Sequence, residues 1–302
     1  MFDIIAVGHL SIDSIFLPSR RSPFTVLGGS SAYVSFVARR LDARVSVVSK
    51  VGADFPDAYK WWLEQEGVDL SGLVKVEDGQ TTRYELRYSD DLSERVLQLK
   101  AKAGAILVDD LPESLKARAV HVAPIDGEVS YEIVEKLRSC APILSLDPQG
   151  LVRNYGEDGK VTVGSLNDKR ILRLVDIFKS SLREAEAVTA TSDLESAVKT
   201  LHESGIKIVI VTLGKDGAAV SVENELHRVP AAKASRIVDP TGAGDAFIGG
   251  FLAEYVKGED CSWSSSVGSS AASFVVEGMG PTNFGSKEEV CDRARGLYEK
   301  EN

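Results

Sequence analysis

The chain has 302 residues, of which 43% are hydrophobic and 26% charged, so it is long enough to bury a large core without disulfides or structural metals. Its 45 acidic and 35 basic residues give a net charge of −10, which argues against nucleic acid or an anionic membrane as the main partner. The three cysteines are widely spaced and form no CxxC pattern, so we expect no zinc site or disulfide framework and favour a reduced, cytoplasmic setting.

Short apolar runs alternate with longer helical patterns along most of the chain. The apolar runs predict buried strands over residues 4–7, 45–49, 119–123, 143–146 and 208–213. The helical patterns predict helices over residues 29–41, 55–66 and 128–139, and a further helix from the capping-box pattern at 192–195. This alternation indicates a single α/β domain in which helices cover both faces of a mostly parallel sheet. No stretch reaches the length of a membrane span, and the first residues lack the features of a signal peptide.

Two stretches break this rhythm. Residues 14–27 are a short run interrupted by polar residues, and residues 80–99 alternate with period two around a turn expected at Asp90-Asp91. Half-buried strands alternate in this way. We therefore expect a small antiparallel flap, formed by segments near 14–27 and 73–100, that projects from the α/β body without a linker.

The topology predicts where a ligand binds. In an open parallel sheet, ligands lie beyond the carboxyl ends of the strands. The residues that directly follow the expected strands and loops are therefore the candidates: Asp13, Gly28, Gly29, Asp126, Asp147, Gly214 and the loop at 239–245. His9 also follows the first strand and is a further candidate for contact with a substrate.

The most specific motif is Asp-Pro-Thr-Gly-Ala-Gly-Asp at residues 239–245, which precedes an apolar helical run. A helix N-terminus carries unpaired N–H groups and a positive dipole end, so it suits an anion. Gly242 and Gly244 have no Cβ atoms to block the approach of a phosphate. Asp245, in the first turn, is placed to act as a general base beside the anion. The alternative is that the glycines only form a turn and Asp245 only starts the helix.

This string, which continues as AFIGGF, resembles the C-terminal signature of the PfkB, or ribokinase-like, family of carbohydrate kinases. Further family features follow in the expected order over nearly the whole chain. Gly8–Asp13 resembles the first-strand pattern, Gly28-Gly29 the di-glycine that closes over the substrate, and residues 212–217 the nucleotide segment TLGxxG. Residues 267–283 resemble the helix and loop that flank the adenine. The resemblance implies a three-layer α/β/α body with a small β-sheet lid, which in many members also forms a homodimer interface.

The resemblance also implies a reaction. An ATP-dependent kinase of this kind moves the γ-phosphate to a hydroxyl of a small sugar, cyclitol or nucleoside while Mg²⁺ bridges the β- and γ-phosphates. Asp245 would deprotonate the acceptor hydroxyl, Asp13 would hydrogen-bond acceptor hydroxyls, and the N–H groups of residues 242–244 would stabilise the transferred group. The catalytic loop residues so implied are Gly242, Ala243, Gly244 and Asp245. The nucleotide-binding positions so implied are Thr212, Gly214, Gly217, Gly242 and Gly244.

Two metal positions follow from the same resemblance. The family often carries Asn-x-x-Glu, and the matching stretch here is Ser181-Leu182-Arg183-Glu184 after a strand expected at 175–178. Glu184 would hold Mg²⁺ through water, the alternative being a solvated acid on a helix face. Asp239 and the carbonyl of Thr241 would bind a monovalent cation such as K⁺. The alternative is that Asp239 only forms the turn before Pro240.

The acceptor is less constrained. Tyr33 stands where ribokinases proper carry Asn, which disfavours ribose, although Tyr33 could simply pack its helix. The segment from Asp147 to Arg153, DPQGLVR, resembles one in inositol-kinase-like members. Arg153 contacts substrate or phosphate under this reading and is a surface arginine otherwise. We rank a cyclitol such as myo-inositol first, then a nucleoside, then a pentose or hexose.

Two other function classes remain as alternatives. One is a catalytically silent regulator that binds a sugar or nucleotide on the same fold, which the unbroken Gly-Ala-Gly-Asp loop disfavours. The other is a dinucleotide-dependent oxidoreductase. The absence of a GxGxxG pattern after the first strand argues against the second.

Overall fold

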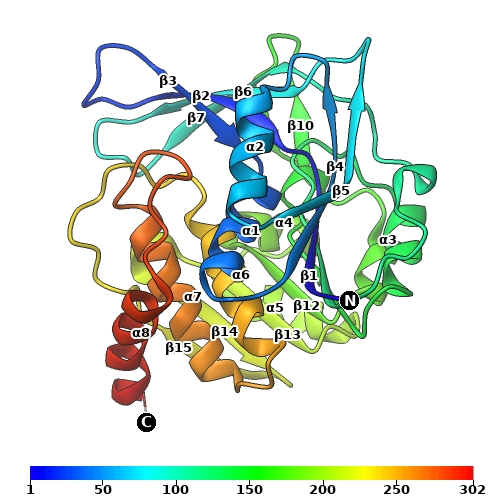
Figure 1. Ribbon diagram of the computed structural model, residues 1–302. Helices are drawn as coiled ribbons and strands as arrows, with labels where there is room; N and C mark the ends of the chain where they lie inside the picture. The colour runs from blue at the N-terminus through cyan, green and yellow to red at the C-terminus, as the bar shows by residue number, and fades with distance from the viewer. Residues whose placement is uncertain (302) are drawn as a thin grey trace.

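A nine-stranded sheet forms the centre of the molecule (Figure 1). The computed structural model describes residues 1–301 and the side chains of residues 1–299. In spatial order the strands of this main sheet are β15 (Glu225–Val229), β14 (Ala218–Val222), β13 (Ile208–Thr212), β12 (Ile177–Ser181), β9 (Ile143–Leu146), β8 (Ala117–Val122), β1 (Phe2–Val7), β4 (Val45–Gly52) and β5 (Asp69–Val76). Neighbours from β13 to β5 pair in parallel, and β14 and β15 extend one edge as antiparallel strands.

Helices cover both faces of the main sheet, as the alternating pattern predicts. One face packs against α1 (Ser30–Arg40), α2 (Asp57–Gln65), α6 (Ala243–Tyr255), α7 (Cys261–Val275) and α8 (Lys287–Glu301). The other face packs against α3 (Tyr131–Arg138), α4 (Leu182–Thr189) and α5 (Leu194–Glu203). The expected three-layer α/β/α body is therefore confirmed.

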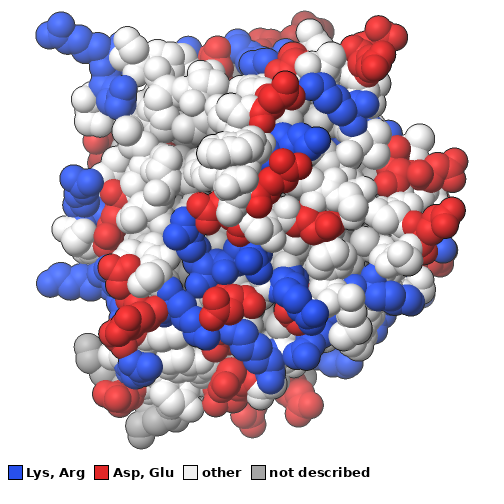
Figure 2. Space-filling model, in the orientation of Figure 1, with Lys and Arg blue, Asp and Glu red and all other residues white. Residues whose placement is uncertain are grey.

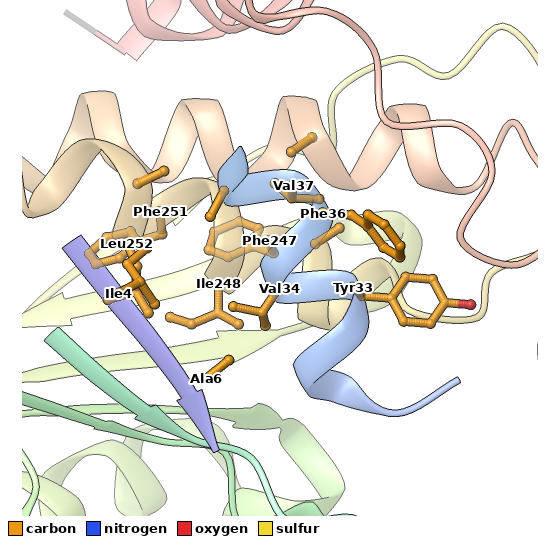
Figure 3. Close-up of a cluster of buried hydrophobic side chains, with 14 of the residues drawn as sticks. Ile4, Ala6, Tyr33, Val34, Phe36, Val37, Phe247, Ile248, Phe251 and Leu252 are labelled. Carbon is orange, nitrogen blue, oxygen red and sulfur yellow. The ribbon is translucent and has the colours of Figure 1, made fainter. Parts of the chain in front are cut away.

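The first strand illustrates why the buried strands read as continuous apolar runs. Ile4 and Ala6 of β1 belong to the core under α1 and α6, whereas Ile5 and Val7 belong to the core on the opposite face. A strand that is covered on both faces has no polar side to alternate with. Figure 3 shows Ile4 and Ala6 beneath the side chains of α1 and α6.

A second sheet forms the lid, which lies at the top of Figure 1. Its order is β3 (Phe24–Gly28), β2 (Ser11–Phe16), β6 (Thr82–Tyr88) and β7 (Arg95–Ala101). The two hairpins are antiparallel, but the central pair β2–β6 is parallel, so the expectation of an all-antiparallel flap was wrong there. Each hairpin follows a parallel strand of the body, β1 or β5, and so their first strands leave in the same direction.

The boundaries of two expected elements differ from the structure. Residues 69–76 pair with β4 in the main sheet, so the second lid segment begins at Thr82 and not near residue 73. The N-cap of α5 is Asp193 and not Ser192, because the Asp193 carboxylate accepts a hydrogen bond from the N–H of Ser196 at 2.8 Å. Asp is among the strongest N-cap residues, so it sets the start of the helix.

The remaining elements are short. Strands β10 (Arg153–Tyr155) and β11 (Val161–Val163) form a two-stranded hairpin. The 3₁₀ turns are η1 (Val108–Asp110), η2 (Gln149–Leu151), η3 (Lys169–Leu174) and η4 (Gly214–Asp216). Lid and body meet in a small apolar cluster in which Ile125 of the body joins Ile15, Tyr84 and Leu86 of the lid.

The surface carries both signs of charge. Figure 2 shows acidic and basic side chains interspersed over the face that bears α1, α6, α7 and α8. Among the residues that the structure describes, no helix is long and apolar enough to cross a membrane.

Candidate active site

A cavity of about 1290 Å³ opens between the lid and the carboxyl ends of the parallel strands. The predicted site residues that line it are Asp13, Gly29, Tyr33, Asp147, Arg153, Glu184, Thr212, Gly214, Gly217, Thr241, Gly242, Ala243, Gly244 and Asp245. Gly28 and Asp239 lie behind this lining. The fold thus brings together residues from both halves of the chain, at the edge where a parallel sheet places its ligands.

The loop before α6 forms one wall of the cavity. Gly242 is the N-cap of α6 with φ 79°, a left-handed conformation that favours glycine. A Cβ atom on Gly242 would lie only 2.2 Å from ring atoms of Tyr33. Glycine therefore lets the loop press against Tyr33. The N–H of Ala243 donates to the carbonyl of Pro240 at 3.3 Å. The start of α6, which borders the cavity, is the kind of helix N-terminus that suits phosphate.

Asp245 lies in the first turn of α6, with its side chain 15% exposed. Its Oδ1 atom is buried without a hydrogen-bond partner and lies 4.0 Å from Nζ of Lys179. Burial raises the pKa of Asp245; the Lys179 ammonium opposes this rise and the Asp147 carboxylate adds to it. Asp245 thus presents a free oxygen with a raised proton affinity, as a general base requires.

Asp13 lies on β2 at the other side of the cavity and is buried. Its Oδ1 accepts a hydrogen bond from the Ser11 hydroxyl at 2.7 Å. Burial raises the pKa of Asp13 to about 6, against the opposing effect of Arg153 and Arg95. A Cβ atom on Gly28 would lie 2.1 Å from Oδ2 of Asp13. Gly28 therefore makes room for this carboxylate and acts behind the lining.

Tyr33 packs in the core and also borders the cavity. Its side chain is 2% exposed and belongs to the core of α1 and α6. Figure 3 shows its ring at the end of this cluster, pointing away from the other labelled side chains. The hydroxyl has no hydrogen-bond partner among the described residues and borders the cavity. Such a buried hydroxyl is available to a polar ligand.

Arg153 is held by its neighbours and is not a free surface arginine. Its guanidinium donates to the carbonyl of Ile125 and, at 2.7 Å, to Oε1 of Gln149. It lies 5.3 Å from the ring centre of Tyr84 in the lid. The amide of Gln149 in turn donates to the hydroxyl of Ser30, at the start of α1. This network fixes a cation and an amide at the acceptor side of the cavity.

Glu184 caps α4 from within the cavity lining. Its Oε2 accepts hydrogen bonds from the Ser181 hydroxyl at 2.6 Å and from the Ser181 N–H at 2.8 Å. Ser181, in place of the usual Asn, therefore completes a capping box. Because this box uses only one carboxylate oxygen, the residue fits a Mg²⁺ ion held through water.

Asp239 behaves as the turn-forming alternative describes. Its Oδ1 accepts hydrogen bonds from the N–H and hydroxyl of Thr241, at 2.9 and 2.6 Å. Its Oδ2 accepts from the N–H of Gly280 at 2.9 Å. With both oxygens occupied by protein donors, the residue does not fit a monovalent cation in this conformation, and we derive no step through one.

The far end of the cavity is lined by small and apolar residues. The predicted segment 212–217 forms one side, and the hydroxyl of Thr212 is used within the fold, donating to the carbonyl of Ser180 at 3.2 Å. The other side is formed by Ala231, Ala232, Ala234, Ile237, Ala272 and Val276. Small apolar walls of this kind accommodate a planar base.

Three residues of the cavity were not singled out from the sequence. Lys179, in the middle of β12, pairs with Asp147 at 2.5 Å. In the lid, the hydroxyl of Tyr88 lies 2.8 Å from that of Thr241, and Arg95 donates to Tyr88 at 3.3 Å. The strand-end rule that selected Asp147 could also have selected Lys179. No comparable signal marks the lid residues, whose approach depends on the fold.

His9 and Asp126 do not reach the cavity, contrary to expectation. Nδ1 of His9 lies 3.0 Å from the Thr82 hydroxyl and 3.4 Å from Oδ2 of Asp126, and Nε2 lies 2.9 Å from the carbonyl of Gly104. Both side chains are buried. They tie the first strand to the points where the second lid hairpin begins and ends.

A lid over an anion-binding helix N-terminus that carries a buried free carboxylate defines a phosphotransferase of the ribokinase fold. The chain belongs to the pfkB family of carbohydrate kinases, whose model matches residues 1–288. It is therefore an enzyme of this kinase family.

The chain is similar to kinases of several small molecules. It is 33% identical over 271 residues to a cytidine kinase of Thermococcus kodakarensis, covering 86% of this chain and 92% of the relative. It is 28% identical over 267 residues to an inositol 3-kinase of Arabidopsis thaliana, covering 85% and 69%. The structure of a pyrophosphate-dependent kinase in the ribokinase family, complexed with a pyrophosphate analogue and myo-inositol, is 25% identical with a TM-score of 0.81, covering 95% and 98%.

Proposed function

We propose that this enzyme transfers the γ-phosphate of ATP to a hydroxyl of a cyclitol or nucleoside, with Asp245 as the general base. The observation that carries this proposal is the buried, unpartnered Oδ1 of Asp245. It lies in the same cavity as the acid at Asp13 and the N–H groups of the α6 loop. A catalytically silent regulator would not require a free buried carboxylate at this point.

The transfer is a single displacement. The acceptor hydroxyl gives its proton to the Asp245 carboxylate, and its oxygen forms a bond to the γ-phosphorus. The bond from that phosphorus to the bridging oxygen breaks, and its electron pair leaves with ADP. The N–H groups of Gly242, Ala243 and Gly244 stabilise the charge on the transferred group. Bound Mg²⁺ would neutralise charge on the phosphates, held from the side of Glu184.

A cyclitol such as myo-inositol is our first choice of acceptor. The acceptor side of the cavity presents Asp13, the free hydroxyl of Tyr33, and the guanidinium of Arg153. These groups supply both hydrogen-bond donors and hydrogen-bond acceptors to a ring that carries a hydroxyl on every carbon.

A nucleoside is the second candidate, favoured by a separate observation. Leu86, Leu97 and Tyr84 of the lid, with Ile125 of the body, add an apolar and aromatic wall to the same cavity. A nucleobase would bury its faces against such a wall. The similarity to a cytidine kinase supports this candidate as well.

The experiment is a coupled assay of ADP release from ATP and Mg²⁺ over myo-inositol, cytidine, adenosine, ribose and fructose. A strong signal with myo-inositol or a nucleoside supports the proposal and names the acceptor. Bound ATP with no turnover on any acceptor would favour the silent regulator, and a hit on ribose or fructose alone would overturn the acceptor assignment.

We also propose a homodimer through the lid in a reducing, cytoplasmic setting. The lid edge strand β7 exposes Val96, whose side chain is 50% accessible, and the three cysteines are free. Light scattering should give the molar mass of a dimer for the wild type and that of a monomer for Val96→Glu. A monomeric wild type would contradict the proposed dimer.

A further inference from the structure

The cavity contains a buried cation beside the proposed base. Lys179 is 5% exposed and lies in the middle of β12. Its ammonium lies 2.5 Å from Oδ2 of Asp147 and 4.0 Å from Oδ1 of Asp245. A charge at this depth is tolerated only when opposite charges compensate for its lost hydration.

The three side chains form a cluster of one positive and two negative charges. Two charged groups from other elements also act on it: Arg95 of the lid lowers the pKa of Asp245, and Glu184 of α4 raises the pKa of Lys179. Burial alone would lower the pKa of Lys179, but the carboxylates of Asp147 and Asp245 outweigh burial and hold that pKa above its ordinary value. Lys179 therefore stays charged at working pH and does not itself act as a base.

The α6 loop is shaped to admit this cation. A Cβ atom on Gly244 would lie 2.8 Å from Nζ of Lys179. Glycine at this position thus lets the ammonium approach the first turn of α6, where Asp245 stands. Asp147 also lines the cavity and is joined to Lys179 by the shorter contact, 2.5 Å against 4.0 Å for Asp245, so it holds the lysine in place.

We propose that Lys179, anchored by Asp147, is a positioning residue that keeps the Asp245 carboxylate ionised and fixed toward the acceptor. This inference rests on the proposed function, since it assigns Lys179 a role through Asp245. A buried carboxylate beside a second carboxylate tends to hold a proton, and a protonated Asp245 cannot accept one from the acceptor. Lys179 supplies the opposite charge that prevents this.

The proposal predicts opposite effects for the two neighbours of Asp245. Lys179→Met removes the cation that lowers the pKa of Asp245 and leaves burial and Asp147, which raise it. The acid limb of the pH profile of kcat should therefore move to higher pH, by about one pH unit or more. Asp147→Asn removes an anion and leaves the lysine to pair with Asp245 alone. Its acid limb should move to lower pH. A lysine that only stabilises the fold would lower activity without these opposed displacements.

The experiment measures kcat at saturating ATP and acceptor between pH 5 and 9 for wild type and both variants. The double variant Lys179→Met/Asp147→Asn serves as the matched control, because it leaves no extra uncompensated charge, and its limb should lie between those of the single variants. Lys179→Arg should restore the wild-type limb in part. Unmoved limbs, or limbs that move in the same direction, would overturn the proposal.

A carbon-13 NMR titration of the Asp245 carboxyl, without substrates, provides a readout independent of turnover. The same two opposed displacements are expected there. If Lys179→Met does not fold, Asp147→Asn and the double variant still decide the outcome. If Asp245→Asn is inactive while the acid limbs of the Lys179 and Asp147 variants do not move, this inference fails and the proposed function stands. If Asp245→Asn keeps full activity, the proposed function itself fails.

Discussion

Single residues in the cavity owe their properties to burial and to a few neighbours. Asp13 is buried and the side chain of Asp245 is 15% exposed, and of these two acids only Asp245 faces a lysine. The strand-end rule and the family resemblance together predicted that these two acids belong to one site. Lys179 was not singled out, although it directly follows the strand expected at 175–178 and the strand-end rule could have selected it. The charge balance of the site depends on Lys179, and so it became visible only in the fold.

The titration of Asp13 predicts a pH dependence of acceptor binding. Its pKa is raised to about 6, so the carboxylate gains a proton as pH falls through that value. The ionised form accepts stronger hydrogen bonds from hydroxyls. The KM for the acceptor should therefore be constant above pH 7 and rise as pH falls below 6. The KM for ATP is the internal control, and an acceptor KM that stays flat down to pH 5 would refute the role of Asp13.

Gly242→Ala should damage the anion-binding loop. Its Cβ would meet the ring of Tyr33 at 2.2 Å, and the residue would also hold a strained φ of 79°. Gly258→Ala is the matched control, since Gly258 has φ 101° but open space around a Cβ. The control should lose about 1–2 kcal/mol of the free energy of unfolding and keep its activity. Gly242→Ala should lose more of that free energy and most of its turnover. Equal losses in both variants would show that the ring contact is unimportant.

The elements of the body could be predicted because each carries a local signal. β1 reads as a buried strand from its apolar run, and α6 begins where the glycine loop predicts. The lid was harder. Period-two alternation identifies a half-buried strand but not its partner, so the parallel pairing of β2 with β6 could not be foreseen. The acceptor wall combines lid and body residues distant in sequence, and no local pattern encodes it.

The lid contacts the loop at residues 239–245 through a hydrogen bond between the hydroxyls of Tyr88 and Thr241 at 2.8 Å. Tyr88→Phe removes this bond, worth about 0.5–1.5 kcal/mol, together with the bond that the same hydroxyl accepts from Arg95 within the lid, and should loosen lid closure. ATP hydrolysis without acceptor should rise relative to transfer, by about twofold to tenfold. Tyr131→Phe is the control, since its hydroxyl bonds only Glu135 at the surface. A ratio of hydrolysis to transfer that is the same in both variants would contradict this role.

His9 ties the lid hairpin to the body, and its charge should contribute to stability. Burial alone would lower the pKa of His9, but the carboxylates of Glu128 and Asp126 outweigh it and raise that pKa. A group whose folded-state pKa is raised stabilises the fold at pH below its unfolded value, and this contribution disappears as pH rises through the folded value. The difference in unfolding free energy between wild type and His9→Gln should therefore be greatest at acidic pH and shrink toward alkaline pH. A difference independent of pH would count against a charged His9.

At the scale of the whole molecule, the central sheet and the lid each contribute different residues to the cavity. The sheet places Asp147, Lys179 and the α6 loop along one edge, and the lid brings Asp13 and Tyr88 over them. Phosphoryl transfer depends on positioning and on the exclusion of water, so the reaction requires both parts. The family and the general position of the site could be predicted from the sequence because the glycine loop at residues 239–245 is a contiguous motif.

The most direct test of this account is the turnover of Asp245→Asn with the best acceptor. We predict that kcat falls by about 10²–10⁴-fold, as expected for loss of a positioned base. ATP binding, measured by calorimetry on the same protein, should stay near the wild-type value because the α6 amides remain. A variant that binds ATP and keeps most of the wild-type kcat would contradict the assignment of Asp245 as the base.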